Sequence, residues 1–423
     1  MKKILFAISA LSAVVAAASS SVDNVQVSQN FPWDGRAVIT FTVSGDPCYV
    51  GLSATWYGQP VAVQLAPPAL SGMPDTPYAA GTYSVMWDFV AAGYGNGEKV
   101  EFQVRAYAVS AADTQKDYLV FDLATGRSEF LDTPPVGGWT DEYKSRYMPF
   151  RRVPAGTYTN GLDSAYHNIP IPNGNVTTTV VAKNRGLKPV EVVISAPYYV
   201  AVFPVTSGQG AYIDGDSLDD NPSYRTRRSY VTLRGNPATD GINWPDTGFE
   251  VATNSFIRKM RDRTAVGTPP GWIIDLPTSA QWEIAMRART TTIFPNGGDE
   301  NTTPAGFTNL VNEIANWGGH NSGIDTVGLN SPNQWGIYDV AGLVDTVMID
   351  AADSTHYNDS HSHRAGTDPK GKSVTASTTS VVCRGGNWSS KEIFTLMPSW
   401  WYSTTITSLS GFRPVINTRD WTR

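Results

Sequence analysis

Thiol groups are scarce in this chain, and its two cysteines, Cys48 and Cys383, set the first limit on its chemistry. Soft metals such as Cu(I) select thiolate ligands, and a site that contains only one of these cysteines cannot supply a pair of thiolates. In an oxidising compartment, an even number of cysteines also allows a disulfide. The alternatives are a bridge between Cys48 and Cys383 or two separate thiols, and the usual burial of free cysteine favours separate thiols.

Three of the five histidines lie close together in the sequence, at His356, His361 and His363. Together with Asp353, they have the ligand types of a zinc or iron site. The alternative is a polar surface loop that precedes the turn at 367–371. A metal site and a solvated loop both stay open at this point.

Aromatic residues gather in the segment from 388 to 402, among serines and threonines. Rigid aromatic rings beside small hydroxyl groups are typical of adaptable binding surfaces. Core packing is the alternative for any single tryptophan. The predicted ligand-binding residues are Trp388, Trp400, Trp401, Tyr402, Arg384 and Asn387.

A strand and a turn must position these residues. Residues 381–384 are apolar enough for a strand, and Gly385 and Gly386 follow them. Glycine permits positive φ and a close approach of other backbone, so the pair indicates a packed turn.

A helix predicted within 276–288 begins at Thr278, which acts as its N-cap, and Gln281 completes a capping box. Its periodicity places Glu283 and Arg287 four residues apart on one face, opposite an apolar face. A second helix is predicted from 255 to 263.

Several of these segments resemble motifs of the formylglycine-generating enzyme family, also called sulfatase-modifying factors. Residues 276–288 resemble L-P-T-E-A-E-W-E-x-A-x-R-A, and residues 332–342 resemble P-N-x-x-G-L-Y-D-M-x-G. Residues 384–388 and 411–413 resemble R-G-G-[SN]-W and G-F-R. The resemblance implies a loop-rich domain at 148–423, related to C-type lectins.

The resemblance also implies a reaction for which this chain lacks residues. Oxidases of the family convert a sulfatase cysteine to formylglycine with oxygen and one copper ion held by two thiolates. Their cysteines lie between the R-G-G turn and G-F-R, whereas residues 389–410 contain no cysteine. We therefore expect no copper centre.

A calcium site of the family is altered too. Its motif G-N-V-W-E-W supplies oxygen ligands, and this chain has Leu343 and Thr346 in place of the asparagine and the glutamate. Neither side chain offers a carboxylate. Calcium stays open through Asp345 or through the acidic loop at 214–221, which fits no defined calcium motif and has a solvated loop as its alternative.

The first 18 residues predict a secretory signal peptide, because two lysines precede an apolar run that ends in alanines. Residues 22–126 show short alternating strands, which predict an immunoglobulin-like β-sandwich with 118–123 as its last strand. Residues 127–147, rich in paired Pro and Gly, are predicted to form a linker. The fold class is therefore α+β.

Composition limits the partners. The net charge is −6, and no basic stripe is present to neutralise phosphates, which excludes nucleic acid. No stretch after the signal peptide is apolar enough to span a membrane. We expect a secreted, periplasmic or cell-surface protein.

The leading hypothesis is a non-catalytic binding module whose partner is a glycan, a peptide or an envelope protein. The alternative is a family enzyme, either similar to the oxidases or a non-heme metal enzyme, that uses His356, His361 and His363. A third hypothesis is a structural surface module that the N-terminal sandwich anchors.

Overall fold

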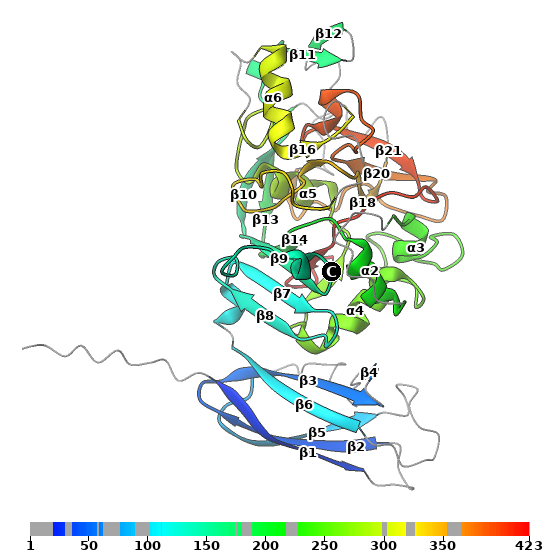
Figure 1. Cartoon of the computed structure of the whole chain (residues 1–423). Coiled ribbons are helices and arrows are strands. Elements are labelled where there is room, and N and C mark those ends of the chain that lie inside the picture. Colours follow the sequence, from blue (N-terminus) through cyan, green and yellow to red (C-terminus); the bar gives the residue numbers. More distant parts are fainter. Residues whose placement is uncertain are drawn as a thin grey trace, which may run out of the picture.

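The computed structural model describes residues 20–29, 36–56, 59–61, 77–88, 102–110, 112–166, 168–173, 176–179, 188–216, 227–297, 303–318, 326–352 and 365–422. A smaller β-rich N-terminal part lies below a larger part that holds the described α-helices (Figure 1). The predicted signal peptide lies outside the described residues. Within the described part, no helix has the length and apolarity to cross a membrane.

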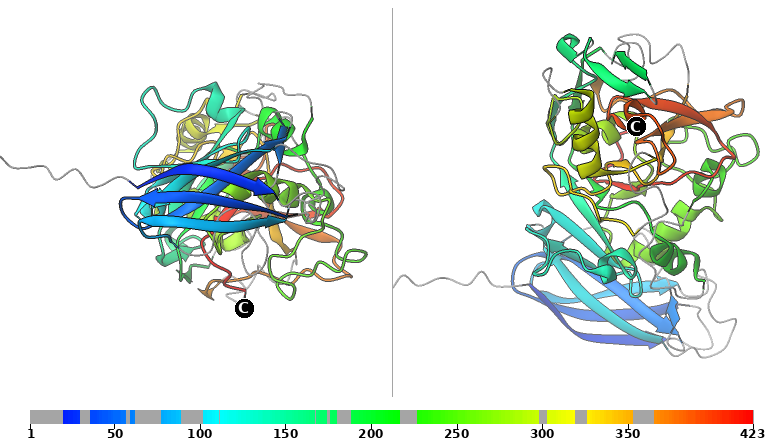
Figure 2. Two further views of the ribbon diagram at one scale, coloured as in Figure 1. Left: turned by 90° about the horizontal axis from the view of Figure 1, so that it is seen from below. Right: turned by 45° about the horizontal axis from the view of Figure 1, so that its top comes forward.

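Two three-stranded sheets form the N-terminal part, with orders β1-β2-β5 and β4-β3-β6. Ile39 and Phe41 of one sheet share a buried apolar cluster with Val50 and Leu52 of the other, so the sheets pack face to face (Figure 2). These strands confirm a β-rich domain, and its immunoglobulin type stays a prediction. The strands are β1 (Ser21–Gln29), β2 (Arg36–Ser44), β3 (Cys48–Trp56), β4 (Gln59–Val61), β5 (Gly81–Asp88) and β6 (Phe102–Ser110).

A six-stranded sheet forms the centre of the larger part, with the order β15-β22-β14-β9-β7-β8. The prediction that 118–123 ends the N-terminal domain is wrong, because β7 pairs with β9 and β8. The predicted linker likewise contains β8 and a short 3-10 helix. The strands are β7 (Tyr118–Asp122), β8 (Ser128–Leu131), β9 (Tyr147–Val153), β14 (Tyr198–Ala201), β15 (Ile273–Asp275) and β22 (Val415–Asn417).

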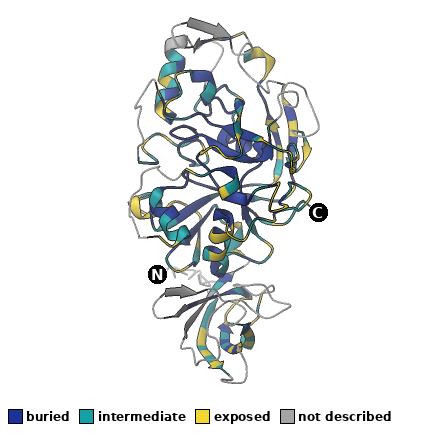
Figure 3. Ribbon diagram, turned by 90° about the vertical axis from the view of Figure 1, so that its right-hand side faces the viewer, coloured by how far each residue is buried: buried dark blue, intermediate teal, exposed yellow. Residues whose placement is uncertain are grey.

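Both faces of this sheet are buried (Figure 3). Alternate side chains of a strand point to opposite faces. Accordingly, Tyr198 and Val200 join one apolar cluster, and Tyr199 and Ala201 join another. The first cluster includes α5 (Ser279–Arg287) and α6 (Pro304–Ile314), and the second includes α3 (Tyr230–Arg234) and α4 (Phe256–Thr264). The sheet is therefore the middle of three layers.

Shorter elements complete the larger part. Three strands form the sheet β18-β20-β21, and three others form β10-β13-β19. The remaining elements are α2 (Ser207–Asp214), β10 (Gly156–Asn160), β11 (Pro170–Asn173), β12 (Val176–Thr179), β13 (Val190–Ile194), β16 (Ala315–Asn316), β17 (Ala341–Gly342), β18 (Thr346–Ala351), β19 (Gly366–Thr367), β20 (Ser380–Arg384) and β21 (Trp401–Thr405).

The two parts of the chain share an apolar contact. Val109 of β6 belongs to the cluster that covers the second face of the six-stranded sheet, and Tyr49 of β3 packs against it. Strand β3 also contacts the 3-10 helix Ala265–Gly267, which directly follows α4. The N-terminal sheets thus rest on the α4 side of the larger part.

Helix α5 begins as predicted, with reciprocal hydrogen bonds between Thr278 and Gln281. The predicted pair of Glu283 and Arg287 also forms, at 2.9 Å. All nine residues of the helix are buried, however, so the pair is an internal ion pair rather than a surface one.

The Glu283 carboxylate joins three segments of chain. Its Oε1 accepts hydrogen bonds from the Gly161 N–H at 2.8 Å and from Arg287 at 2.9 Å. Its Oε2 lies 3.3 Å from a guanidinium nitrogen of Arg384, at the end of β20. Arg384 in turn donates to Ser279 Oγ and to the Pro398 carbonyl. One buried carboxylate therefore holds β10, α5 and the R-G-G turn together.

Arg413, from the G-F-R motif, is a second buried connection. Its guanidinium donates to four carbonyls, those of Ala201 and Val202 and those of Tyr338 and Asp339, at 2.8–2.9 Å. Burial lowers the pKa of Arg413 to about 10, and the nearby Asp339 carboxylate opposes that shift. The motif thus serves the fold, by joining the end of β14 to the segment at 338–339.

We expect Glu283→Ala to destabilise the protein by about 3–5 kcal/mol, because it leaves two buried guanidinium groups without their carboxylate. Urea unfolding measures this change. The control is Asp262→Ala, which removes the half-exposed Arg258–Asp262 pair on α4 and should cost at most about 1 kcal/mol. A Glu283→Ala variant as stable as that control would contradict the role of Glu283.

Asp339 predicts a pH dependence. Burial raises the pKa of Asp339 to about 6, whereas an aspartate in the unfolded chain titrates near about 3.9. Between these two pH values the folded state binds more protons than the unfolded state does. The contribution of Asp339 to stability therefore falls as pH rises from about 4 to 6. Asp339→Asn should remove that fall. The stability of the variant relative to wild type should then rise by about 2 kcal/mol between about pH 4 and 6 in urea unfolding, and a constant difference would contradict the shift.

Candidate functional site

The rim that carries the predicted site runs from β20 through the R-G-G turn to β21. Gly385 and Gly386 both have positive φ, of 91° and 65°. A Cβ on Gly386 would lie 2.7 Å from Leu396 Cδ2, so the predicted close packing of this turn is confirmed. After the turn, the 3-10 helix Ile393–Leu396 leads into β21.

The structure divides the predicted ligand-binding residues into two groups. Arg384 and Trp401 are buried, with exposed fractions of 2% and 1%, and Arg384 makes the internal bonds described above. Trp388, Trp400, Tyr402 and Asn387 are half-buried and reach the surface. The available surface therefore comes from these four residues.

The half-buried side chains are held in place. The Trp400 ring meets Phe394 edge to face, with 4.7 Å between ring centroids. The Asn387 side-chain oxygen accepts bonds from the backbone N–H and the hydroxyl of Ser389. The Asn387 N–H donates to Ser390 Oγ at 3.0 Å. The turn after the paired glycines is thus ordered by its own hydroxyls.

Neither cysteine fits the copper site that the resemblance implies. Cys48 lies in β3 of the N-terminal sheets, and Cys383 lies in β20. Both are buried free thiols, which excludes a disulfide between them in this structure. With no cysteine in 389–410, the donor set for a copper ion held by two thiolates is missing from the rim.

Cys383 instead belongs to a polar cluster with the buried Asp345 and the half-buried Tyr402. The Tyr402 hydroxyl donates to Asp345 Oδ2 at 2.5 Å, and the Cys383 thiol donates to the same oxygen at 3.4 Å. Burial raises the pKa of the Cys383 thiol well above its usual value, and the Asp345 charge raises it further. Burial likewise raises the pKa of Tyr402. The thiol is therefore protonated and inert at neutral pH.

The calcium site that the resemblance implies does not fit these residues either. Leu343 is buried in an apolar cluster with Val344, and Thr346 is buried at the start of β18. The carboxylate that remains, Asp345, is bonded to Cys383 and Tyr402. The sequence position therefore lacks the oxygen donors that a hard cation needs.

The predicted histidine site, His356, His361, His363 and Asp353, lies outside the described residues. So do residues 217–221 of the acidic loop, whose described member Asp214 pairs with Arg228 and with Lys259. In the part of the chain that the structure does describe, no three His, Cys, Asp or Glu residues are grouped to hold a metal ion.

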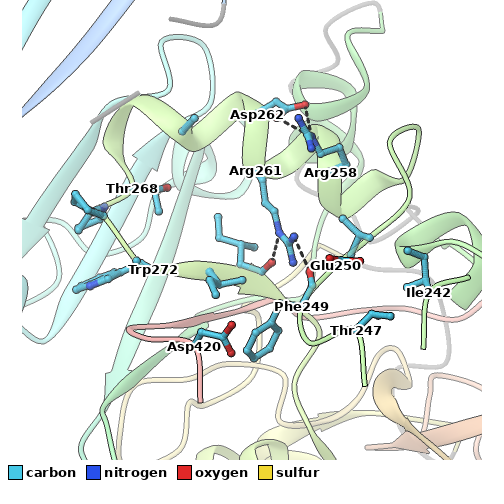
Figure 4. Close-up of a pocket in the computed structure, with 17 residues that line it drawn as sticks. Ile242, Thr247, Phe249, Glu250, Arg258, Arg261, Asp262, Thr268, Trp272 and Asp420 are labelled. Atoms are coloured by element: carbon cyan, nitrogen blue, oxygen red, sulfur yellow. Dashed lines mark hydrogen bonds and ion pairs between the residues drawn. The ribbon is translucent and has the colours of Figure 1, made fainter. Parts of the chain in front are cut away.

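A cavity of about 560 Å³ lies beside α4, and its lining residues come from segments other than the rim (Figure 4). Arg261 reaches across it from α4 and donates to the carbonyls of Ile274 and Phe249, at 2.7 and 2.8 Å. A third bond joins Arg261 to the fully buried Asp275, which also pairs with Arg234.

Sequence reasoning missed this cavity. Its lining comes from separate segments, at 242–251, at 258–274 and at Asp420, whose proximity no motif indicates. The one local signal was a tryptophan in the turn at 269–272, Pro-Pro-Gly-Trp, because such a turn presents a large ring near the surface.

We expect neither thiol to react with Ellman's reagent in the native protein, because both are buried. After unfolding in urea, two thiols should react, and the count should be the same with and without prior reductant. A native thiol that reacts rapidly, or a count that rises with reductant, would contradict the assignment of two buried free cysteines.

The profile of the sulfatase-modifying factor enzyme 1-like domain matches residues 154–418. No curated protein matches the chain. Treponema denticola variable protein 1 is 18% identical and has a TM-score of 0.42, over 64% of this chain and 95% of that one. PvdO from Pseudomonas aeruginosa is 18% identical with a TM-score of 0.41, over 64% and 94%. CarF is 14% identical with a TM-score of 0.31, over 62% and 98%. The family match covers more than half of the chain, which therefore belongs to the sulfatase-modifying-factor family.

Proposed function

We propose that this protein is a non-catalytic binding member of its family, and that its rim holds an extended segment of a peptide or of an envelope protein. The observation that carries the proposal is the contrast at the R-G-G turn. Arg384 stabilises the fold of the family through its bonds to Glu283, Ser279 and Pro398. The segment after the turn, in contrast, contains no cysteine.

A strand edge supports a peptide as the partner. Strand β21 is an outer strand of the sheet β18-β20-β21. The Ile406 N–H donates to the Thr379 carbonyl, and hydrogen-bonded pairs alternate along an antiparallel ladder. Tyr402 and Thr404 therefore direct their backbone groups toward β20, whereas Ser403 directs its N–H and C=O away from it. An extended chain can pair with such an edge.

The side chains around this edge suit selective binding. Trp400, which directly precedes β21, is half-buried, and Ser403 and Thr405 are exposed along the strand. Backbone pairing supplies affinity for any extended chain, whereas aromatic surface selects among side chains. Export, expected from the first 18 residues, places such a module where it meets envelope proteins or peptides.

Ser403→Pro tests the edge. Proline removes the N–H that we assign to the outside, and it is tolerated at edge positions that do not bond within the sheet. Ten-residue peptides selected on the wild-type protein from a display library should bind Ser403→Pro at least about tenfold more weakly. Calorimetry measures the affinities.

Ser403→Ala is the matched control, because it removes the hydroxyl and keeps the N–H. Ser403→Ala should bind the selected peptides as tightly as the wild type does. Trp400→Ala should lower the affinity for some of these peptides more than for others. The proposal fails if the library yields no binder, or if Ser403→Pro and Ser403→Ala bind equally well.

A further inference from the structure

The cavity beside α4 is built from other residues than the rim, and its chemistry is different. We propose that it binds a short neutral saccharide. Its volume, about 560 Å³, lies within the range of about 300–1,000 Å³ that is usual for small-molecule sites. This inference is independent of peptide binding at β21.

The cavity offers hydrogen-bond donors that are already oriented. A guanidinium carries five N–H donors, and three of those of Arg261 are used by Ile274, Phe249 and Asp275. These three bonds fix the position of the Arg261 guanidinium in the lining of the cavity. Arg258 adds a second guanidinium from the preceding turn of α4, held through its Nε by the Asp262 carboxylate.

The cavity also offers acceptors. Carboxylates of Glu250, Asp262 and Asp420 belong to its lining (Figure 4). Asp420 is held in place, because its Oδ1 accepts bonds from the N–H and the hydroxyl of Thr422. Groups that only donate and groups that only accept thus share one small space.

This combination favours a ligand whose polar groups can do both. A hydroxyl donates one hydrogen bond and accepts others, so adjacent hydroxyls of a sugar can satisfy a guanidinium and a carboxylate together. An anion would meet the carboxylates of Glu250, Asp262 and Asp420, and a cation would meet two guanidinium groups. A neutral polyhydroxyl compound avoids both repulsions.

An aromatic wall completes the match. Trp272 lines the cavity at one side, and its indole is braced by Tyr199, whose ring is stacked at 5.3 Å, and by the edge of Phe130. A rigid indole with exposed surface can pack against the C–H face of a pyranose ring. The lining therefore combines charged groups with one half-buried indole, and a sugar has both polar and apolar surface.

The test uses the mature full-length protein and a panel of neutral disaccharides, namely maltose, cellobiose, lactose and N,N′-diacetylchitobiose. Inorganic phosphate and putrescine serve as an anionic and a cationic probe. Saturation-transfer NMR detects binding, and calorimetry gives the affinity. We expect at least one disaccharide to bind, and neither charged probe.

Arg258→Ala should lower the affinity for the disaccharide about tenfold, because it removes a charged hydrogen bond. Trp272→Phe, which keeps a ring against Tyr199, should also weaken it. Lys259→Ala is the matched control: it breaks a similar half-exposed ion pair, with Asp214, on the same helix but outside the cavity. Ser403→Pro should leave sugar binding unchanged, so the two proposals fail separately.

Three results would overturn the proposal. The first is a panel in which no disaccharide binds at millimolar concentration. The second is binding of phosphate or putrescine at this cavity in place of a sugar. The third is an equal effect of Arg258→Ala and Lys259→Ala on the bound disaccharide.

Discussion

The buried carboxylate of Glu283 is the constraint on which the larger part of this protein depends. It has an exposed fraction of 1%, and it binds Arg287 of its own helix, Arg384 of β20 and the Gly161 N–H that follows β10. A buried carboxylate is tolerated only where its charge and its lone pairs are matched, so these three segments must meet in one arrangement. The bonds of Arg384 to the core therefore fix the position of the R-G-G turn.

That constraint explains how the fold can persist without a pair of cysteines after the R-G-G turn. The family resemblance places the copper thiolates in the segment after the turn, whereas Glu283, Arg384 and Arg413 bond to Arg287, to Ser279 and to backbone groups. The exposed side chains of 389–410 can consequently change while the scaffold stays, whereas its core residues cannot, namely Ile393, Phe394, Leu396, Met397 and Trp401. In this chain they are hydroxyls and aromatic rings, which suit contact with a partner. Cys383, which precedes the turn, is buried and donates a hydrogen bond to Asp345.

Local signals predicted local structure well. Short-range rules determine three features that the sequence predicted: the capping box of Thr278 and Gln281, the helix that begins after Ser255 and the packed glycine turn.

The strand at Tyr118–Asp122 was also predicted as a strand, but its pairing partner was not. It pairs with β9, whose alternation is no different from that of the N-terminal strands, so periodicity cannot choose between the two sheets. The burial of the Arg384 and Trp401 side chains was not predicted for a similar reason, because composition cannot say which aromatic or basic residue points inward. The cavity beside α4 depends on contacts between distant segments, and only a folded chain shows them.

The central claim is that this family member keeps the scaffold and lacks the sulfur donors for oxidation. It is tested most directly by incubating the copper-supplemented protein under air with a cysteine-containing peptide from a sulfatase and following the peptide mass. We predict that the cysteine is not converted to formylglycine. Repeated turnover to the aldehyde, with one copper bound per chain, would contradict it.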